Sequence, residues 1–177
     1  IAQALDSVLA QTYPNLEIII MDDCSTDNSI GIIQDYLRQY PQLTFMSTGT
    51  NKGNTRAFNM AWRASKGAYI IDFATDDVLL PERVAQQVAA FQKLDDSYGV
   101  VYSDAEYIDD EDQHVRFHCQ RNKAGEVISF APSGDIFQHL LSRYFICPPT
   151  MMMKRQVFED LQGYDEALAY EDFDFWV

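Results

Sequence analysis

Apolar residues along the first hundred positions follow two alternating periods. They recur at helical spacing over residues 1–9 and stop before Pro14, which disfavours helix in the residue before it. Residues 16–21 then form a short run rich in β-branched side chains, as in a strand buried on both faces. The pattern therefore predicts a helix followed by a buried strand.

The same alternation continues downstream. Ser25, Thr26 and Asp27 are capping candidates for a helix that runs to residue 40, and a strand over residues 43–46 follows. The next predicted elements are a helix with its apolar stripe over residues 57–62 and a Lys66-Gly67 cap, a strand at 68–73, a helix opened by Pro81, and a strand at 100–103. Strands alternating with helices predict an α/β fold, with a mostly parallel sheet flanked by helices in three α/β/α layers.

The pattern becomes less regular after residue 104. Residues 109–112 are acidic and predict a hairpin turn, and residues 133–144 predict a helix. The apolar stretch 145–153 is broken by Pro148-Pro149, which favours an edge strand or a loop that lines the substrate. Its methionines at 151–153 suit core filling better than an acceptor pocket.

Length and charge limit the possible functions. A chain of 177 residues suits a single domain. Its formal net charge of -14 argues against nucleic acid as a partner, because affinity for phosphate backbones comes from clustered Lys and Arg.

Three widely spaced cysteines imply no disulfide framework and favour a reducing cytosol. No apolar run reaches the roughly 18 residues of a membrane span. The chain starts inside a helical pattern and stops just after an acidic aromatic stretch, so we expect an excerpt of a longer domain.

Two acidic pairs follow predicted strands, Asp22-Asp23 and Asp76-Asp77. In open α/β sheets, ligands bind beyond the carboxyl ends of the strands. Either pair alone would also suit a solvated turn, but the two together favour a site. Magnesium and manganese bind through one or two carboxylates plus phosphate oxygens of a substrate, so the sequence predicts a divalent cation, Mn²⁺ or Mg²⁺, that bridges a diphosphate.

Three ordered segments resemble the family 2 glycosyltransferases, which have the GT-A fold. Residues 16–27 read LEIIIMDDCSTD, similar to the first acidic signature of that family. Residues 66–81, which run from Lys-Gly-Ala-Tyr-Ile to Asp76-Asp77 and Pro81, resemble its strand, DXD-type metal motif and helix. Gly163-Tyr164-Asp165-Glu166, followed by Glu171-Asp172, resembles its C-terminal signature. The resemblance covers nearly the whole chain, although residues 105–150 match only in general character.

The resemblance implies a role for each acidic residue. Asp23, with Asp22 as a less certain neighbour, would contact the nucleotide of the donor. Asp76 and Asp77 would contact the ribose and the metal in an order that the resemblance leaves open. Asp172 would be the general base of an inverting transfer. Without the other segments, the acidic residues around Asp172 would instead predict the first turn of a helix, where negative charge is favourable.

Other positions are less well determined. Arg56 is a candidate contact for the diphosphate or base and equally a candidate exposed helix arginine. The family usually has an acidic residue where this chain has Ala74 and an arginine where it has Phe58, so some donor contacts must differ. The resemblance also implies a preceding strand, absent from this sequence, whose end supplies a nucleotide contact.

The implied reaction is transfer of a sugar from a nucleoside diphosphate, by default a UDP-sugar, to a glycan or lipid-linked acceptor. Residues 1–104 would form the nucleotide-sugar-binding half and residues 105–177 the acceptor-binding half, in the cytoplasm, at the inner face of the membrane in one interpretation. One alternative is a noncatalytic relative that binds nucleotide-sugars or glycans. A phosphoacceptor receiver domain is a weaker alternative, because it would leave Glu171-Asp172 without a role.

Overall fold

The structure is a computed structural model that describes residues 1–129, 131–143, 145–168 and 175. Its first eight elements alternate between helix and strand: α1 (Ala2–Leu9), β1 (Ile19–Asp22), α2 (Ser29–Gln39), β2 (Thr44–Ser47), α3 (Asn54–Ala64), β3 (Tyr69–Ile70), α4 (Arg83–Phe91) and β4 (Val100–Val101). The remaining elements are β5 (Glu106–Ile108), β6 (His114–Phe117), α5 (Phe137–Ser142), the 3-10 turn η1 (Pro148–Thr150), β7 (Met152–Lys154) and α6 (Arg155–Leu161). The predicted helix–strand alternation is thereby confirmed.

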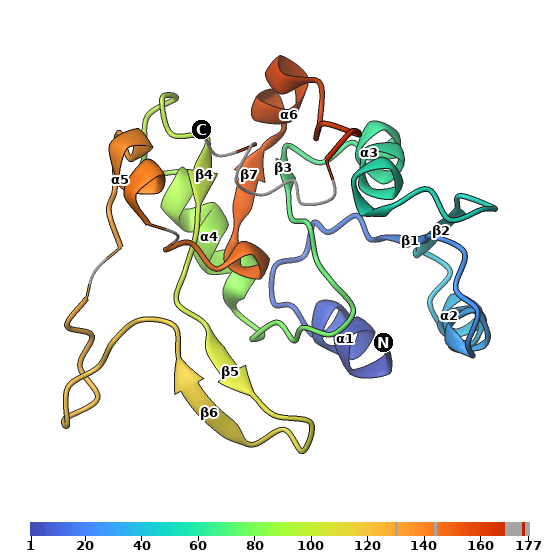
Figure 1. The fold of residues 1–177 in the computed structure, drawn as a ribbon. Coiled ribbons are helices and arrows are strands. Elements are labelled where there is room, and N and C mark those ends of the chain that lie inside the picture. Colours follow the sequence, from blue (N-terminus) through green and yellow to red (C-terminus); the bar gives the residue numbers. More distant parts are fainter. Residues whose placement is uncertain (130, 144, 169–174, 176–177) are drawn as a thin grey trace.

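Within each sheet, the strands that alternate with helices run parallel to one another, and β7 lies antiparallel between β3 and β4 (Figure 1). β1 and β2 form a parallel pair with Ile19 opposite Thr44. β7 lies between β3 and β4 and is antiparallel to both, so β3 and β4 run parallel to each other on either side of it. β5 and β6 form the separate antiparallel hairpin that the acidic turn at 109–112 predicted.

Helices cover both faces of the sheet that contains β7. Met152 packs with Val84, Val88 and Phe91 of α4 on one face. Met153 packs on the other face with Phe158 of α6, and Phe58 and Trp62 of α3 lie against the same cluster. Consecutive strand residues point to opposite faces, which explains how neighbouring methionines fill two cores. The predicted three-layer arrangement is confirmed, and so is the core role of the methionines.

A third core lies under α1 and α2. Leu5 of α1, Ile20 of β1 and Ile33 of α2 are buried together with Leu43, and none of the four is more than 7% exposed. These positions are the apolar stripes and the strand face that the sequence pattern marks. α1 and α2 therefore cover the β1–β2 pair and form a core with it that is distinct from the cores of the sheet that contains β7.

The structure corrects several local predictions. The stretch 145–153 does not end in an edge strand: both prolines lie in η1, before β7 begins, so Met152 and Met153 can pair with a strand on each side. α3 ends at Ser65 in an extended conformation, so Gly67 does not cap it. The N-cap of α2 is Asn28 rather than an earlier residue. No helix among the described residues is long and apolar enough to cross a membrane.

Candidate functional site

Asp22, the last residue of β1, organises the loop that follows it. Its side chain is 5% exposed and accepts hydrogen bonds from the main-chain N–H groups of Cys24 and Ser25, at 3.0 and 3.1 Å, and from the Ser47 hydroxyl at 3.4 Å. Cys24 has a φ of 70°, in the left-handed region, and these bonds hold the chain there. Burial acts to raise the pKa of Asp22, but the hydrogen bonds from Ser25, Cys24 and Ser47 outweigh it and lower the pKa below its ordinary value of 3.8.

We expect Asp22→Ala to destabilise the protein by about 1–3 kcal/mol, because it leaves two main-chain N–H groups without their acceptor. Since the folded-state pKa is depressed, this contribution is present above pH 3.8 and is lost as the pH falls through the folded value. Urea unfolding of both proteins between pH 3 and 7 measures the difference. Asp27→Ala, which removes one exposed bond to the Ser29 N–H, is the control and should cost less.

Asp23 connects the end of β1 to the start of α3. Its Oδ1 accepts bonds from the Thr48 hydroxyl at 2.7 Å and the Lys52 N–H at 2.8 Å, and its Oδ2 accepts from the Gly53 N–H at 2.8 Å. Gly53 is the N-cap of α3 and has a φ of 88°, a conformation that glycine adopts without strain. Burial of Asp23 opposes its ionisation, but the bonds from Lys52, Thr48 and Gly53 lower its pKa. The carboxylate is therefore held charged beside α3.

The second acidic pair lies in the loop between β3 and α4. The Asp77 N–H donates to the Ala74 carbonyl at 3.3 Å, which forms a turn, and Asp76 is exposed at its tip. Burial of Asp77, and then the charge of Asp76, raise the pKa of Asp77, while Arg83 opposes the shift. A bound cation would relieve the repulsion between the two carboxylates, so the pair fits a divalent metal ion.

Arg83, in the first turn of α4, is fixed behind this loop. Its Nη2 donates to the Met151 carbonyl at 3.0 Å and its Nε to Gln87 Oε1 at 3.2 Å. Burial lowers its pKa to about 10, so the guanidinium remains charged at neutral pH. It places positive charge near Asp77. This role of Arg83 could not be predicted from the sequence, because an arginine two positions after Pro81 has the pattern of an ordinary helix residue.

The two acidic pairs do not form a complete metal cage. Among the described residues, no group of three or more His, Cys, Asp or Glu side chains lies close enough to hold a metal ion. Magnesium and manganese commonly bind through one or two carboxylates and complete their shell with substrate phosphate and water. Asp76 and Asp77 fit that pattern, with the remaining ligands left to a diphosphate.

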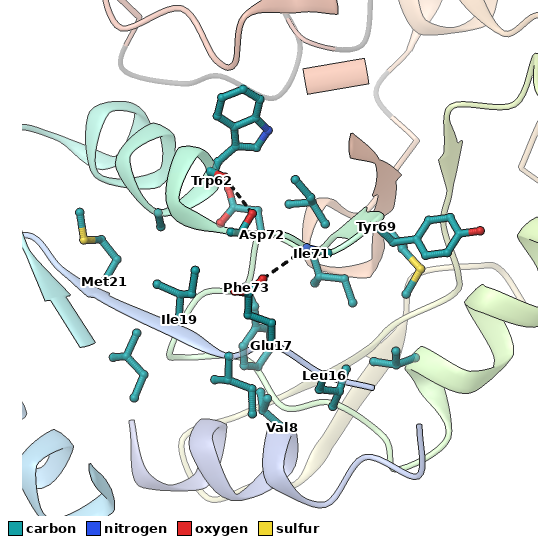
Figure 2. Close-up of a pocket in the computed structure, with 18 of the residues that line it drawn as sticks. Val8, Leu16, Glu17, Ile19, Met21, Trp62, Tyr69, Ile71, Asp72 and Phe73 are labelled. Atoms are coloured by element: carbon teal, nitrogen blue, oxygen red, sulfur yellow. Dashed lines mark hydrogen bonds between the residues drawn. The ribbon is translucent and has the colours of Figure 1, made fainter. Parts of the chain in front are cut away.

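A groove of about 620 Å³ separates β1 from β3. Figure 2 shows Ile19 and Met21 from β1 and Tyr69 and Ile71 from the β3 side around it. Its interior is apolar. Asp23, Asp72 and Thr75 are among its lining residues, and Asp76 follows Thr75 directly in sequence. The structure thus brings Asp23 and the residue before Asp76 to one groove, although Asp76 and Asp77 do not line it.

The edges of β1 and β3 that face this groove have no strand partner among the described residues. Ile18 and Asp22 accept main-chain bonds from Thr44 and Thr48, on the β2 side. Alternate residues of a strand direct their main-chain groups to opposite sides, so those of Ile19 and Met21 face the groove. Charged phosphates would be poorly solvated in this apolar interior, so the groove is a poor place for a diphosphate.

The C-terminal segment returns to α3. Tyr164 and Glu166 contact Asn59, and Arg56 Nε lies 3.5 Å from Glu166 Oε2. Arg56 is thus half exposed and ion-paired, and its contact with a donor stays a prediction. Asp172, the predicted base, lies outside the described residues. Asn59 was not predicted from the sequence. It lies three positions before Trp62, so a polar residue on the apolar stripe of this helix was the one sign of a buried contact.

The chain belongs to the glycosyltransferases: it matches the family described as Glycosyl transferase family 2 over residues 1–162. It is 30% identical to chondroitin synthase of Escherichia coli, over all of this chain and 24% of that protein. It is 27% identical to the putative glycosyltransferase EpsE of Bacillus subtilis, over all of this chain and 60% of that protein. The chain therefore spans about a quarter to three-fifths of the length of these relatives.

Solved structures show the same fold. The mannosyltransferase PcManGT from Pyrobaculum calidifontis, in complex with GDP-Man and Mn²⁺, matches with a TM-score of 0.64 and 21% identity, over 97% of this chain and 45% of that one. S. aureus TarS in complex with UDP matches with a TM-score of 0.64 and 19% identity, over 98% of this chain and 48% of that one. The chain has the GT-A fold, as the sequence predicted.

Proposed function

We propose that this chain binds a nucleotide-sugar, with a UDP-sugar as the first candidate, and transfers the sugar to an acceptor hydroxyl with inversion. The observation that carries the proposal is the placement of Asp22-Asp23 and Asp76-Asp77. Asp23 and Thr75, the residue before Asp76, line the same groove, in a chain of glycosyltransferase family 2. The ligands of the two solved structures, GDP-Man with Mn²⁺ and UDP, support a nucleotide-sugar donor.

In the proposed reaction, Asp23 and Asp76 contact the nucleoside and Asp76 and Asp77 hold Mn²⁺ or Mg²⁺ against the diphosphate. The cation supplies Lewis-acid stabilisation of the charge on the leaving diphosphate. Asp172 takes the proton of the acceptor hydroxyl as that oxygen bonds to the anomeric carbon, and the carbon–diphosphate bond breaks on the opposite face. A single displacement inverts the anomeric centre. Arg56, near the start of α3, would contact the donor.

The proposal assigns donor binding to residues 1–104 and acceptor binding to residues 105–177 of one domain that continues beyond both ends of this chain. The apolar groove supports the continuation, because the edges of β1 and β3 that face it have no strand partner in the part of the chain that the structure describes, and an extended segment there would pair with both strands. A glycan or lipid-linked acceptor, used in the cytoplasm at the inner membrane face, completes the proposal.

The test is the release of nucleoside diphosphate from UDP-sugars and from GDP-mannose, with Mn²⁺, with Mg²⁺ and with a chelator. We expect metal-dependent release that an added glycan acceptor accelerates. A noncatalytic relative would show a metal-dependent thermal shift with the nucleotide-sugar and no release. Release of pyrophosphate from a nucleoside triphosphate would instead indicate a nucleotidyltransferase.

A further inference from the structure

Asn59 joins α3 to a segment that lies about a hundred residues later in the chain. It is fully buried, at 0% exposure. Its Nδ2 donates to the Tyr164 carbonyl at 2.9 Å, and its Oδ1 accepts from the Tyr164 N–H at 3.0 Å. One side-chain amide thus bonds both main-chain groups of one residue, as a neighbouring strand would. Two bonds in opposite directions fix the orientation of the backbone at Tyr164 as well as its distance.

Gly163 shows how closely the two segments approach. Its φ is 92°, and a Cβ at this position would lie 2.4 Å from Asn59 Oδ1. Any larger residue would meet the amide and would also be strained by the positive φ. The turn after α6 is therefore shaped around the Asn59 side chain, and the Tyr164 ring packs 4.6 Å from that of Phe58, the preceding residue of α3.

Glu166 adds a third contact on the solvent side. Its Oε1 accepts from Asn59 Nδ2 at 3.2 Å and lies 3.4 Å from Arg63 Nη1, while its Oε2 lies 3.5 Å from Arg56 Nε. Arg56 and Arg63 lie about two turns apart on α3, so Glu166 sits between them along the helix. The hydrogen bond from Asn59, and then the two arginines, lower the pKa of Glu166 and keep it charged.

These contacts form a continuous series from the first acidic loop to the C-terminal segment. Asp23 binds the Gly53 N–H at the start of α3, and Asn59 lies in the middle of that helix. Figure 1 shows the segment after α6 beside α3. Six residues after Glu166 the chain reaches Asp172. The N-cap of α3 therefore contacts the donor-side loop through its main chain, and the Asn59 side chain contacts the backbone at Tyr164.

We propose that Asn59 is a positioning residue: it holds residues 163–166 against α3, at the start of the segment that carries the proposed base. The inference rests on the proposed transferase function. A purely structural role would make Asn59 matter for stability alone. A positioning role makes Asn59 matter for turnover while donor affinity stays intact, because the proposed donor contacts are Asp23, Asp76 and Asp77.

The experiment compares Asn59→Ala with Ile33→Ala, which removes buried methyl groups of α2 in a different core and serves as the control for lost stability. For each protein we measure kcat at saturating donor, donor Kd, and hydrogen exchange over residues 163–168, well below the unfolding temperature. Asn59→Ala should lower kcat at least tenfold, keep the donor Kd within about threefold, and speed exchange in that segment alone. Ile33→Ala should change neither kcat nor that local exchange.

Equal kcat in the two variants, unchanged exchange over residues 163–168, or a parallel loss of kcat and donor affinity would each overturn the inference. If Asn59→Ala does not fold, Glu166→Gln replaces it, because this side chain is 39% exposed and the change keeps its volume. It should lower kcat severalfold and speed the same exchange, and no effect on either would overturn the inference. Absence of metal-dependent release by the wild-type chain would count against the proposed function, whereas the exchange comparison still tests whether Asn59 holds residues 163–168 against α3.

Discussion

Asp77→Ala should abolish the thermal shift that a UDP-sugar produces with Mn²⁺, and should lower transfer by at least about a hundredfold. Asp76 and Asp77 are the two protein ligands proposed for the cation, so removing one takes away half of them. Asp77 is the less exposed of the two carboxylates, and it is the one that lies near the charge of Arg83. Differential scanning fluorimetry with and without Mn²⁺ and donor measures the shift, and nucleoside diphosphate release measures the transfer.

The same substitution should not destabilise the free protein at neutral pH. Burial and Asp76 raise the folded-state pKa of Asp77, so its ionised form costs stability as the pH rises above the ordinary value of 3.8. Removing the carboxylate relieves that cost, and the unfolding temperature without ligand should equal or exceed that of the wild type. Asp110→Ala, which removes an exposed carboxylate of the β5–β6 hairpin, is the control and should keep both the shift and the transfer. An undiminished metal-dependent shift in Asp77→Ala would refute the metal assignment.

Much of the fold follows from local pattern. The apolar runs and helical stripes before residue 104 predicted each helix and strand in order, because burial imposes period 2 or 3.6 on the sequence wherever one face meets a core. The strand ends were less visible: the apolar run begins at Leu16, but pairing with β2 begins only at Ile19, and Leu16 is 37% exposed. Hydrophobicity marks which residues suit a strand, while hydrogen-bond partners decide where the strand begins.

The position of β7 could not be read from its own residues. Pro148 and Pro149 favour an edge position when they belong to the strand. Here the chain turns through η1 first, so Met152 and Met153 pair on both sides. The order of strands in a sheet depends on contacts between residues about eighty positions apart, as between Tyr69 and Lys154, and no local period encodes them.

The same difference between local pattern and long-range contacts applies to the candidate site. The sequence predicted acidic pairs after two strands, and the structure brings Asp23 and Thr75, the residue before Asp76, to one groove that Asp76 and Asp77 do not line. The sequence grouped Asp22 with Asp23 as donor contacts, with Asp23 first, but did not predict that the two point to different sides of the chain: Asp22 holds its own loop, and Asp23 holds the start of α3. Nor did it predict the bonds from Asn59 to Tyr164, because these join residues 105 positions apart.

Asp172→Asn should leave donor binding intact while it lowers transfer by about a hundred- to ten-thousandfold. The amide keeps the size of the side chain but cannot accept the proton of the acceptor hydroxyl, and the metal and nucleotide contacts proposed for Asp23, Asp76 and Asp77 do not involve it. Nucleoside diphosphate release with acceptor measures the loss, and the Mn²⁺-dependent thermal shift with donor measures what is retained. Asp160→Asn, at an exposed position of α6, is the control and should transfer at the wild-type rate. Transfer within about threefold of wild type in Asp172→Asn would assign the base to another residue, whereas loss of the thermal shift together with transfer would make Asp172 part of the donor site instead.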